Sequence, residues 1–316
     1  MGRGEKRGDG SAQTVNNGVM LRNEDVVAEV EASQGGFAAH SAGGQITRWD
    51  SASFGPLLFA SKESAYGVGS PIRGGIPLCF PWFGALRDED EGGVVLLGRS
   101  RAAGSHGFAR NVNWRQTASS VGEDGAWLVR YELTNEDLPV VDAPPDTSPQ
   151  SFLATLEAVF SDVLLDLTFT VKNTGSNAFW YEEALHTYFE VADSTSTELF
   201  GLEGAAYVDK AAGGAPGVQD RPVTFGVEVD RVFQSPAALE LRDGGNGRSI
   251  RIVKERSGAT IVWNPGPELA RTMSHLGDEE YRDFVCVEAA NAAESAVTLQ
   301  PGEEHTMRVR YEVSAL

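Results

Sequence analysis

A single arginine lies in the middle of an almost wholly apolar segment, PIRGGIPLCFPWFG, at residues 71–84. A guanidinium keeps its proton, so burying one among apolar residues without a partner is very costly. Arg73 therefore either pairs with a carboxylate of the protein or binds an anion that comes from outside. A second arginine, Arg110, lies in SHGFARNVNW at residues 105–114, where a surface ion pair is the simpler interpretation.

Two further segments place an ionisable group among apolar residues. His186 lies in YEEALHTYFEV, where it is either a core histidine bonded to a backbone carbonyl or an acid–base group. Glu288 follows FVCV, and in a strand it would share a face with Phe284 and Cys286. Burial there would raise its pKa toward the range of a general base, whereas a position at the end of the strand would leave it in water. Both residues are candidates for acid–base catalysis.

Several common kinds of site are not indicated. The glycines near Arg73 do not form G-x-G-x-x-G, and the chain has neither a G-x-S-x-G nor an H-E-x-x-H motif. Its five histidines are too scattered for their spacing to indicate a metal site, and neither cysteine belongs to a C-x-x-C pair. Cys79 and Cys286 lie in apolar runs that suit buried free thiols. We expect no metal and no cofactor.

Composition limits the partners. The 316 residues include 26 Lys and Arg against 45 Asp and Glu, which gives a net charge of -19. Such a surface repels nucleic acids and anionic lipids, so neither is an expected partner. No stretch has the apolar length of a membrane span, and the N-terminus lacks the apolar core of a secretory signal. We expect a cytoplasmic protein, in which an anionic substrate would need a local basic pocket.

Alternating apolar and polar residues indicate the elements that hold these groups. LLDLTFTVKN at 164–173 and MRVRYEV at 307–313 both alternate with period two, which is typical of half-buried strands. SIRIVKE and ATIVWN are further short strands, and glycine, proline and asparagine turns separate them. The pattern predicts an all-β protein, a large antiparallel β-sandwich.

The expected domain organisation is simple. Residues 1–18, rich in glycine and charge, predict a disordered N-terminal tail, and residues 19–316 predict a single domain. The acidic, proline-rich segment 135–150 could be a linker between domains. Similar strand patterns flank it on both sides, so we favour a surface insertion within one domain.

The four segments above, together with YVDK, VEVDRVF and VWNPGP, resemble the glucose-6-phosphate 1-epimerase family. This family comprises the hexose-phosphate mutarotases within the broader aldose 1-epimerase group. The similarity covers nearly the whole chain after the tail, with the motifs in the family's order. It implies a galactose mutarotase-like supersandwich with an open cleft on one sheet.

The resemblance also implies roles for seven residues. The family's catalytic histidine and glutamate correspond to His186 and Glu288, and its phosphate-binding arginines to Arg73 and Arg110. The family usually has glutamine before the histidine of its HGxAR motif, whereas this chain has serine, whose shorter side chain leaves that contact open. The remaining substrate-binding positions are Ser105, His106 and Asp230.

The implied reaction is anomer interconversion of a hexose 6-phosphate, with glucose 6-phosphate as the first choice. Glu288 would take the proton of the C1 hydroxyl while His186 protonates the ring oxygen, without metal or redox cofactor. The alternatives are an unphosphorylated aldose as substrate and a non-catalytic carbohydrate-binding protein on the same scaffold. A glycoside hydrolase is less favoured because it needs two carboxylates. A monomer is expected.

Overall fold

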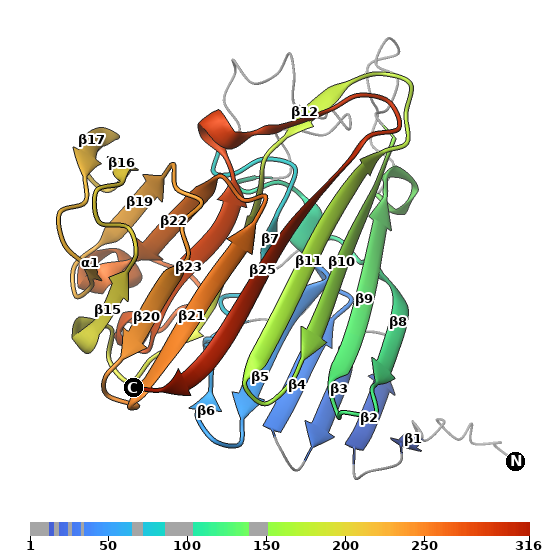
Figure 1. Cartoon of the computed structure of the whole chain (residues 1–316), viewed down its shortest axis with the longest axis horizontal. Coiled ribbons are helices and arrows are strands. Elements are labelled where there is room, and N and C mark those ends of the chain that lie inside the picture. Colours follow the sequence, from blue (N-terminus) through green and yellow to red (C-terminus); the bar gives the residue numbers. More distant parts are fainter. Residues whose placement is uncertain are drawn as a thin grey trace, which may run out of the picture.

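The computed structural model describes residues 13–15, 19–24, 27–32, 35–64, 72–85, 104–138 and 151–316 (Figure 1). Antiparallel strands dominate these residues and form three large sheets and one two-stranded sheet. The described residues contain one α-helix, α1 (Gly266–Ala270), and none of their helices is long and apolar enough to cross a membrane. The predicted all-β class is confirmed.

The largest sheet has nine strands in the order β18-β15-β20-β21-β25-β11-β10-β9-β8. Strand β11 (Leu164–Asn173) has the predicted bounds, and its apolar side chains are buried at alternate positions, as the period-two pattern requires. The other strands are β8 (Arg115–Val121), β9 (Trp127–Thr134), β10 (Phe152–Phe160), β15 (Thr197–Phe200), β18 (Val223–Thr224), β20 (Leu239–Asp243), β21 (Arg248–Glu255) and β25 (Glu304–Ala315).

The second sheet has eight strands, of which seven follow the order β17-β16-β19-β22-β23-β13-β7 while β14 pairs with β23. Strand β23 (Phe284–Asn291) is buried along its whole length, so both of its faces are covered. The other strands are β7 (Leu78–Cys79), β13 (Glu183–Leu185), β14 (Tyr188–Glu190), β16 (Ala206–Asp209), β17 (Ala215–Val218), β19 (Val229–Phe233) and β22 (Ala259–Asn264).

The third sheet follows the order of the chain, β1 to β6. Its strands are β1 (Gln13–Val15), β2 (Val19–Glu24), β3 (Val27–Ala32), β4 (Gly35–His40), β5 (Gln45–Ser51) and β6 (Gly55–Pro56), and the two-stranded sheet pairs β12 (Phe179–Tyr181) with β24 (Val297–Leu299).

The hydrophobic core lies between the nine-stranded sheet and the other two large sheets. The ring of Phe37 in β4 lies 5.1 Å from that of Phe160 in β10. The ring of Phe189 in β14 lies 5.1 Å from that of Tyr311 in β25. Side chains of facing sheets therefore meet in one apolar layer, which is the packing of a β-sandwich.

The predicted division into a tail, 1–18, and one domain stays a prediction. Within the predicted tail the structure describes β1, which pairs with β2 and so gains hydrogen-bond partners for its backbone. Residues 1–12 and 16–18 lie outside the described residues. Most of the acidic segment, 139–150, lies outside them too, but the flanking strands β9 and β10 pair along their length. The segment therefore connects neighbouring strands of one sheet.

Candidate active site

Two neighbouring strands of the eight-stranded sheet bring His186 and Glu288 together. Strand β13 pairs with β23 so that Leu185 lies opposite Ala289. His186 is the next residue after β13, and its backbone N–H donates to the carbonyl oxygen of Pro77 at 3.0 Å. The pairing thus places a histidine beside a glutamate that is distant in sequence.

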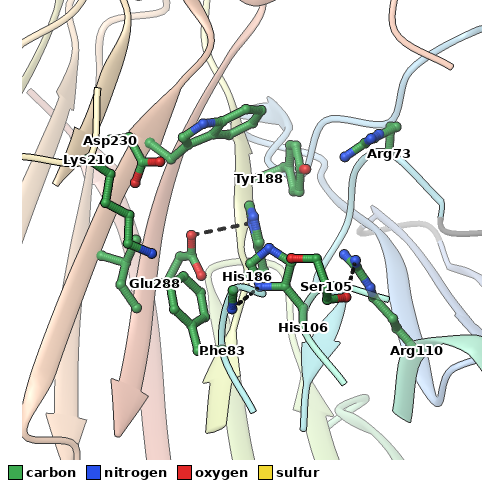
Figure 2. A pocket seen from close by; sticks show the side chains of 13 residues that line it. Arg73, Phe83, Ser105, His106, Arg110, His186, Tyr188, Lys210, Asp230 and Glu288 are labelled. Carbon is green, nitrogen blue, oxygen red and sulfur yellow. Dashed lines mark hydrogen bonds and ion pairs between the residues drawn. The ribbon is translucent and has the colours of Figure 1, made fainter. Parts of the chain in front are cut away.

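A cavity of about 370 Å³ lies over this pair. All seven predicted site residues line it, so the fold brings together residues from five separate segments of the sequence (Figure 2). They are Arg73, Ser105, His106, Arg110, His186, Asp230 and Glu288, and the other lining residues are Phe83, Gly84, Tyr188, Lys210, Ile261 and Trp263.

His186 and Glu288 contact each other but lack the hydrogen bonds that buried groups normally have. Nδ1 of His186 lies 3.5 Å from Oε1 of Glu288, and the glutamate side chain is only 1% exposed. Neither that nitrogen nor either carboxylate oxygen has a hydrogen-bond partner among the described residues. The imidazole stacks on the ring of Tyr188, with centroids 4.9 Å apart and planes at 12°. Stacking holds the imidazole in place while its polar atoms remain available.

Burial acts on both members of this pair in favour of the neutral form. It lowers the pKa of His186 well below its ordinary value, and the nearby His106, Arg110 and Arg73 lower it further. Burial raises the pKa of Glu288 well above its ordinary value, and the charge of Asp230 adds to this effect. Burial therefore favours the arrangement in which the pair's one proton is on the glutamate, and transfer of that proton to the histidine gives a charge-separated pair.

Arg73 is held by its backbone rather than by a carboxylate. Its N–H donates to Oγ of Ser64 at 2.8 Å, and its carbonyl accepts from the N–H of Ser61 at 2.8 Å. Its Nε is buried without a hydrogen-bond partner among the described residues, and no ion pair of Arg73 occurs among them. The next residue, Gly74, has φ +134°, and a Cβ there would come 2.4 Å from the backbone of Ala60. Glycine is therefore required for this loop to pack.

Arg110 lies in a short 3-10 helix, η3 (Ala109–Asn111). One of its terminal nitrogens, Nη2, donates to the carbonyl oxygen of Ser105 at 2.8 Å, whereas its Nε is buried without a partner among the described residues. The surface ion pair considered for Arg110 is not present in this part of the chain. Ser105 thus orients the arginine through its backbone.

His106 is a neutral member of the pocket. Burial, reinforced by Arg110, Lys210 and Arg73, lowers its pKa to about 3. Its Nδ1 accepts a hydrogen bond from the N–H of Gly84 at 3.2 Å, so the proton of the neutral ring belongs on Nε2. His106 can therefore donate a hydrogen bond to a ligand without carrying charge.

The opposite side of the pocket carries Asp230 and Lys210. Asp230 lies in β19, and burial raises its pKa. The N–H of Lys210 donates to the carbonyl oxygen of Asp230 at 2.7 Å, and its Nζ lies 4.4 Å from the centre of the Phe83 ring. Lys210 and Trp263 lie in YVDK and VWNPGP, and the sequence of these motifs indicates no site role for either residue. Nothing local distinguishes a lining residue of this kind from a surface lysine or a core aromatic.

No group of three or more His, Cys, Asp or Glu side chains within the described residues could hold a metal ion. The described cysteines, Cys79 and Cys286, are free and buried, as their apolar runs predicted. Burial raises the pKa of each thiol, and the charge of Glu288 raises both further. Both thiols therefore stay neutral beside the pair.

Comparisons with known proteins agree with this architecture. The family model described as aldose 1-epimerase matches residues 30–312. A protein of Cenchrus ciliaris with the provisional name glucose-6-phosphate 1-epimerase is 32% identical over 276 residues, 84% of this chain and 78% of that protein. An Escherichia coli K12 protein with the same provisional name is 31% identical over 255 residues, 80% of this chain and 79% of that protein.

A solved structure from Salmonella typhimurium, provisionally described as a mutarotase, has a TM-score of 0.81 and 24% identity over 98% of this chain and 97% of that one. A Synechocystis protein has a TM-score of 0.73 and 18% identity over 93% of this chain and 97% of that one. These likenesses confirm the predicted mutarotase-like sandwich. The chain belongs to the aldose 1-epimerase family and is an isomerase.

Proposed function

We propose that the protein interconverts the α and β anomers of a hexose 6-phosphate, with glucose 6-phosphate as the first choice. The observation that carries the proposal is a pair of half-buried arginines, Arg73 and Arg110, whose buried Nε atoms lack partners among the described residues and which line the same cavity as His186 and Glu288. A planar guanidinium suits phosphate because it donates two parallel hydrogen bonds. The names of the curated relatives support the same substrate class.

Ring opening needs a base and an acid at two ends of one carbon–oxygen unit. The Glu288 carboxylate takes the proton of the C1 hydroxyl, the C1–O5 bond breaks as C1 becomes a carbonyl, and protonated His186 gives its proton to O5. Rotation about C1–C2 presents the other face of the carbonyl. The hydroxyl at C5 then adds to C1 as both protons return. Each positioned group contributes roughly 10²–10⁴-fold.

The pKa directions at the pair fit this sequence of proton transfers. Ring opening converts a charge-separated pair into neutral His186 and protonated Glu288. This neutral pair is the form that burial favours. The site therefore stabilises the proton arrangement of the open-chain state, and the charge-separated form must be reached before each opening. Activity requires that the pair carry one proton in total, which gives a bell-shaped pH dependence.

The hydrogen-bonding groups of the pocket bear on two alternative functions. An unphosphorylated aldose would leave the Arg73 and Arg110 Nε atoms without an anion, at the cost of unsatisfied buried donors. A non-catalytic binding protein would have no use for a histidine and a glutamate in contact and without other partners. Both observations favour a phosphorylated substrate and catalysis.

The test is the rate of anomer exchange for glucose 6-phosphate and for glucose, measured side by side by NMR exchange at the anomeric position. We expect a much larger kcat/KM for the phosphate ester. Equal kcat/KM values for the two sugars would contradict a preference for the phosphate ester. Anomer exchange no faster than in the absence of protein would contradict the proposed reaction.

A further inference from the structure

We propose that Lys210 is a positioning residue of this reaction: its ammonium group makes it easier for the Glu288 carboxyl to reach the ionised form that takes the proton from the substrate. The inference rests on the proposed function for the identity of the substrate, but the carboxyl itself can be followed without one. No role for Lys210 follows from the motif in which it lies.

The chain places the lysine on the glutamate side of the pocket. Lys210 follows directly after β16, and its N–H donates to the carbonyl oxygen of Asp230 in the neighbouring strand β19 at 2.7 Å. Its Nζ lies 4.4 Å from the centre of the Phe83 ring, a cation–π contact that directs the long side chain inward. In Figure 2 the side chain of Lys210 points toward Glu288, which lies between Lys210 and His186.

The charges around Glu288 oppose one another. Asp230 raises the pKa of Glu288, whereas Lys210 and Arg110 lower it. Lys210 also lowers the pKa of Asp230. One ammonium therefore acts against the mutual repulsion of two carboxylates, each of whose pKa values burial raises.

Arg110 cannot replace the lysine in this role. Arg110 lowers the pKa of Glu288, which favours the ionised glutamate. It also lowers the pKa of His186, which disfavours the protonated histidine that the reaction needs. Arg73 also lowers the pKa of His186. Lys210 is among the charges that lower the pKa of Glu288 but not among those that lower the pKa of His186, so it favours the ionised glutamate with less penalty to the protonated histidine. In the view of Figure 2, Glu288 lies between the two side chains.

The other ionisable groups near Glu288 do not compete with this effect. Burial raises the pKa of the nearby thiols and phenols, which stay neutral: Cys79, Cys286, Tyr188 and Tyr311. His106 is also neutral, with its pKa lowered to about 3. Burial and the charges of Asp230, Lys210 and Arg110 therefore set the pKa of Glu288.

Removing the lysine charge should shift the shared proton toward Glu288. Lys210 is exposed at the pocket, so water weakens its field, and we expect kcat for Lys210→Met to fall roughly threefold to tenfold. The alkaline limb of the pH profile, where the pair loses its shared proton, should move to higher pH. Lys210→Arg, which retains the charge, should keep most of the wild-type kcat and leave the alkaline limb close to its wild-type pH. Taking the ratio of variant to wild type at each pH cancels the titration of the substrate phosphate.

A second measurement needs no substrate. Infrared difference spectroscopy follows the protonated carboxyl band of Glu288, which is identified by its absence in Glu288→Gln. In Lys210→Met this band should persist to higher pH than in the wild type. Arg242→Met is the matched control, because Arg242 also lies over an aromatic ring, Phe200, at 4.2 Å but outside the cavity. It should leave the band and kcat unchanged.

The outcomes separate this inference from the proposed function. A higher KM for Lys210→Met with unchanged kcat and an unmoved Glu288 titration would make the lysine a substrate contact and overturn the inference. A lower melting temperature with an unmoved titration would make it structural and also overturn it. If the wild type does not exchange sugar phosphates, the proposed function fails, while the infrared titration still decides whether Lys210 controls Glu288.

Discussion

Arginines with a buried Nε atom occur in two contrasting environments in this molecule. Arg248 in β21 is 1% exposed, and its Nε bonds Asp243 at 3.0 Å. Its other nitrogens donate to the backbone carbonyls of Phe54 and Pro56 at 2.6 and 2.7 Å and of Glu190 at 2.7 Å. All three nitrogens of this guanidinium are therefore satisfied inside the protein.

The pocket arginines, Arg73 and Arg110, differ from Arg248 in their hydrogen bonding. The Nε atoms of Arg73 and Arg110 are also buried, yet neither has a partner among the described residues. The carboxylates show the same contrast, because Asp243 accepts from Arg248 and Asn246 whereas Glu288 accepts from none of the described residues. Buried polar groups are normally hydrogen-bonded. Missing hydrogen-bond partners thus distinguish the buried polar atoms of the pocket from those of the scaffold.

The largest effect is expected where the pocket does chemistry. Glu288→Gln keeps the shape but removes the base, so kcat should fall by roughly 10²–10⁴-fold while the protein stays folded. His186→Ala should act in the same way by removing the acid. Anomer exchange rates and circular dichroism on the same preparations check this. A folded variant with wild-type turnover would withdraw the role of that residue.

The scaffold arginine should affect stability instead. Arg248→Met leaves the Asp243 carboxylate buried without its counter-charge, which should lower the free energy of unfolding by about 3–5 kcal/mol. The same substitution in the pocket, Arg73→Met, removes no internal partner and should change stability little. Urea unfolding of both variants makes the comparison. Equal destabilisation of the two would break the distinction between scaffold and pocket.

The pocket arginine should affect substrate choice. Losing a charge-assisted hydrogen bond costs about 1.5–3 kcal/mol, so Arg73→Met should lower the preference for glucose 6-phosphate over glucose by roughly ten- to a hundredfold. Arg73→Lys should recover part of this, because it keeps the charge but not the two-pronged geometry. The measurement is kcat/KM for both sugars. An equal loss on both would contradict a phosphate contact.

The smallest effect concerns the stability cost of an unsatisfied carboxyl. Because burial raises the pKa of Glu288 in the folded protein, its contribution to stability is present at acidic pH and lost as pH rises through the folded pKa. Glu288→Gln removes this loss, so the variant should be more stable than the wild type at mildly alkaline pH, by about 0.5–2 kcal/mol.

The difference in melting temperature should shrink as pH falls toward the ordinary glutamate value of 4.5. Melting curves at several pH values check it. A difference that does not vary with pH would mean that the effect of the substitution does not come from the charge of Glu288.

Local pattern predicted much of the scaffold. The alternation in 164–173 indicated β11 with its bounds, because a strand shows its buried face directly as a period of two. Local pattern did not indicate β1, which lies inside the predicted tail, because strand pairing depends on a partner elsewhere in the chain. A cytoplasmic location, a monomeric state, and the absence of nucleic-acid and membrane partners stay predictions.

The sequence identified the candidate residues, whereas only the fold shows which of them contact one another. Motif resemblance pointed to seven residues, and all of them line one cavity. The 3.5 Å contact between His186 and Glu288, and the place of Lys210 beside Glu288, follow from pairing of strands far apart in sequence. Whether Arg73 is satisfied like Arg248 or left with a free Nε is likewise invisible in its flanking residues. The physical reason is that apolar periodicity is a property of residues close together in the sequence. The hydrogen bonds and the pKa of a buried group depend on every group that packing brings near it.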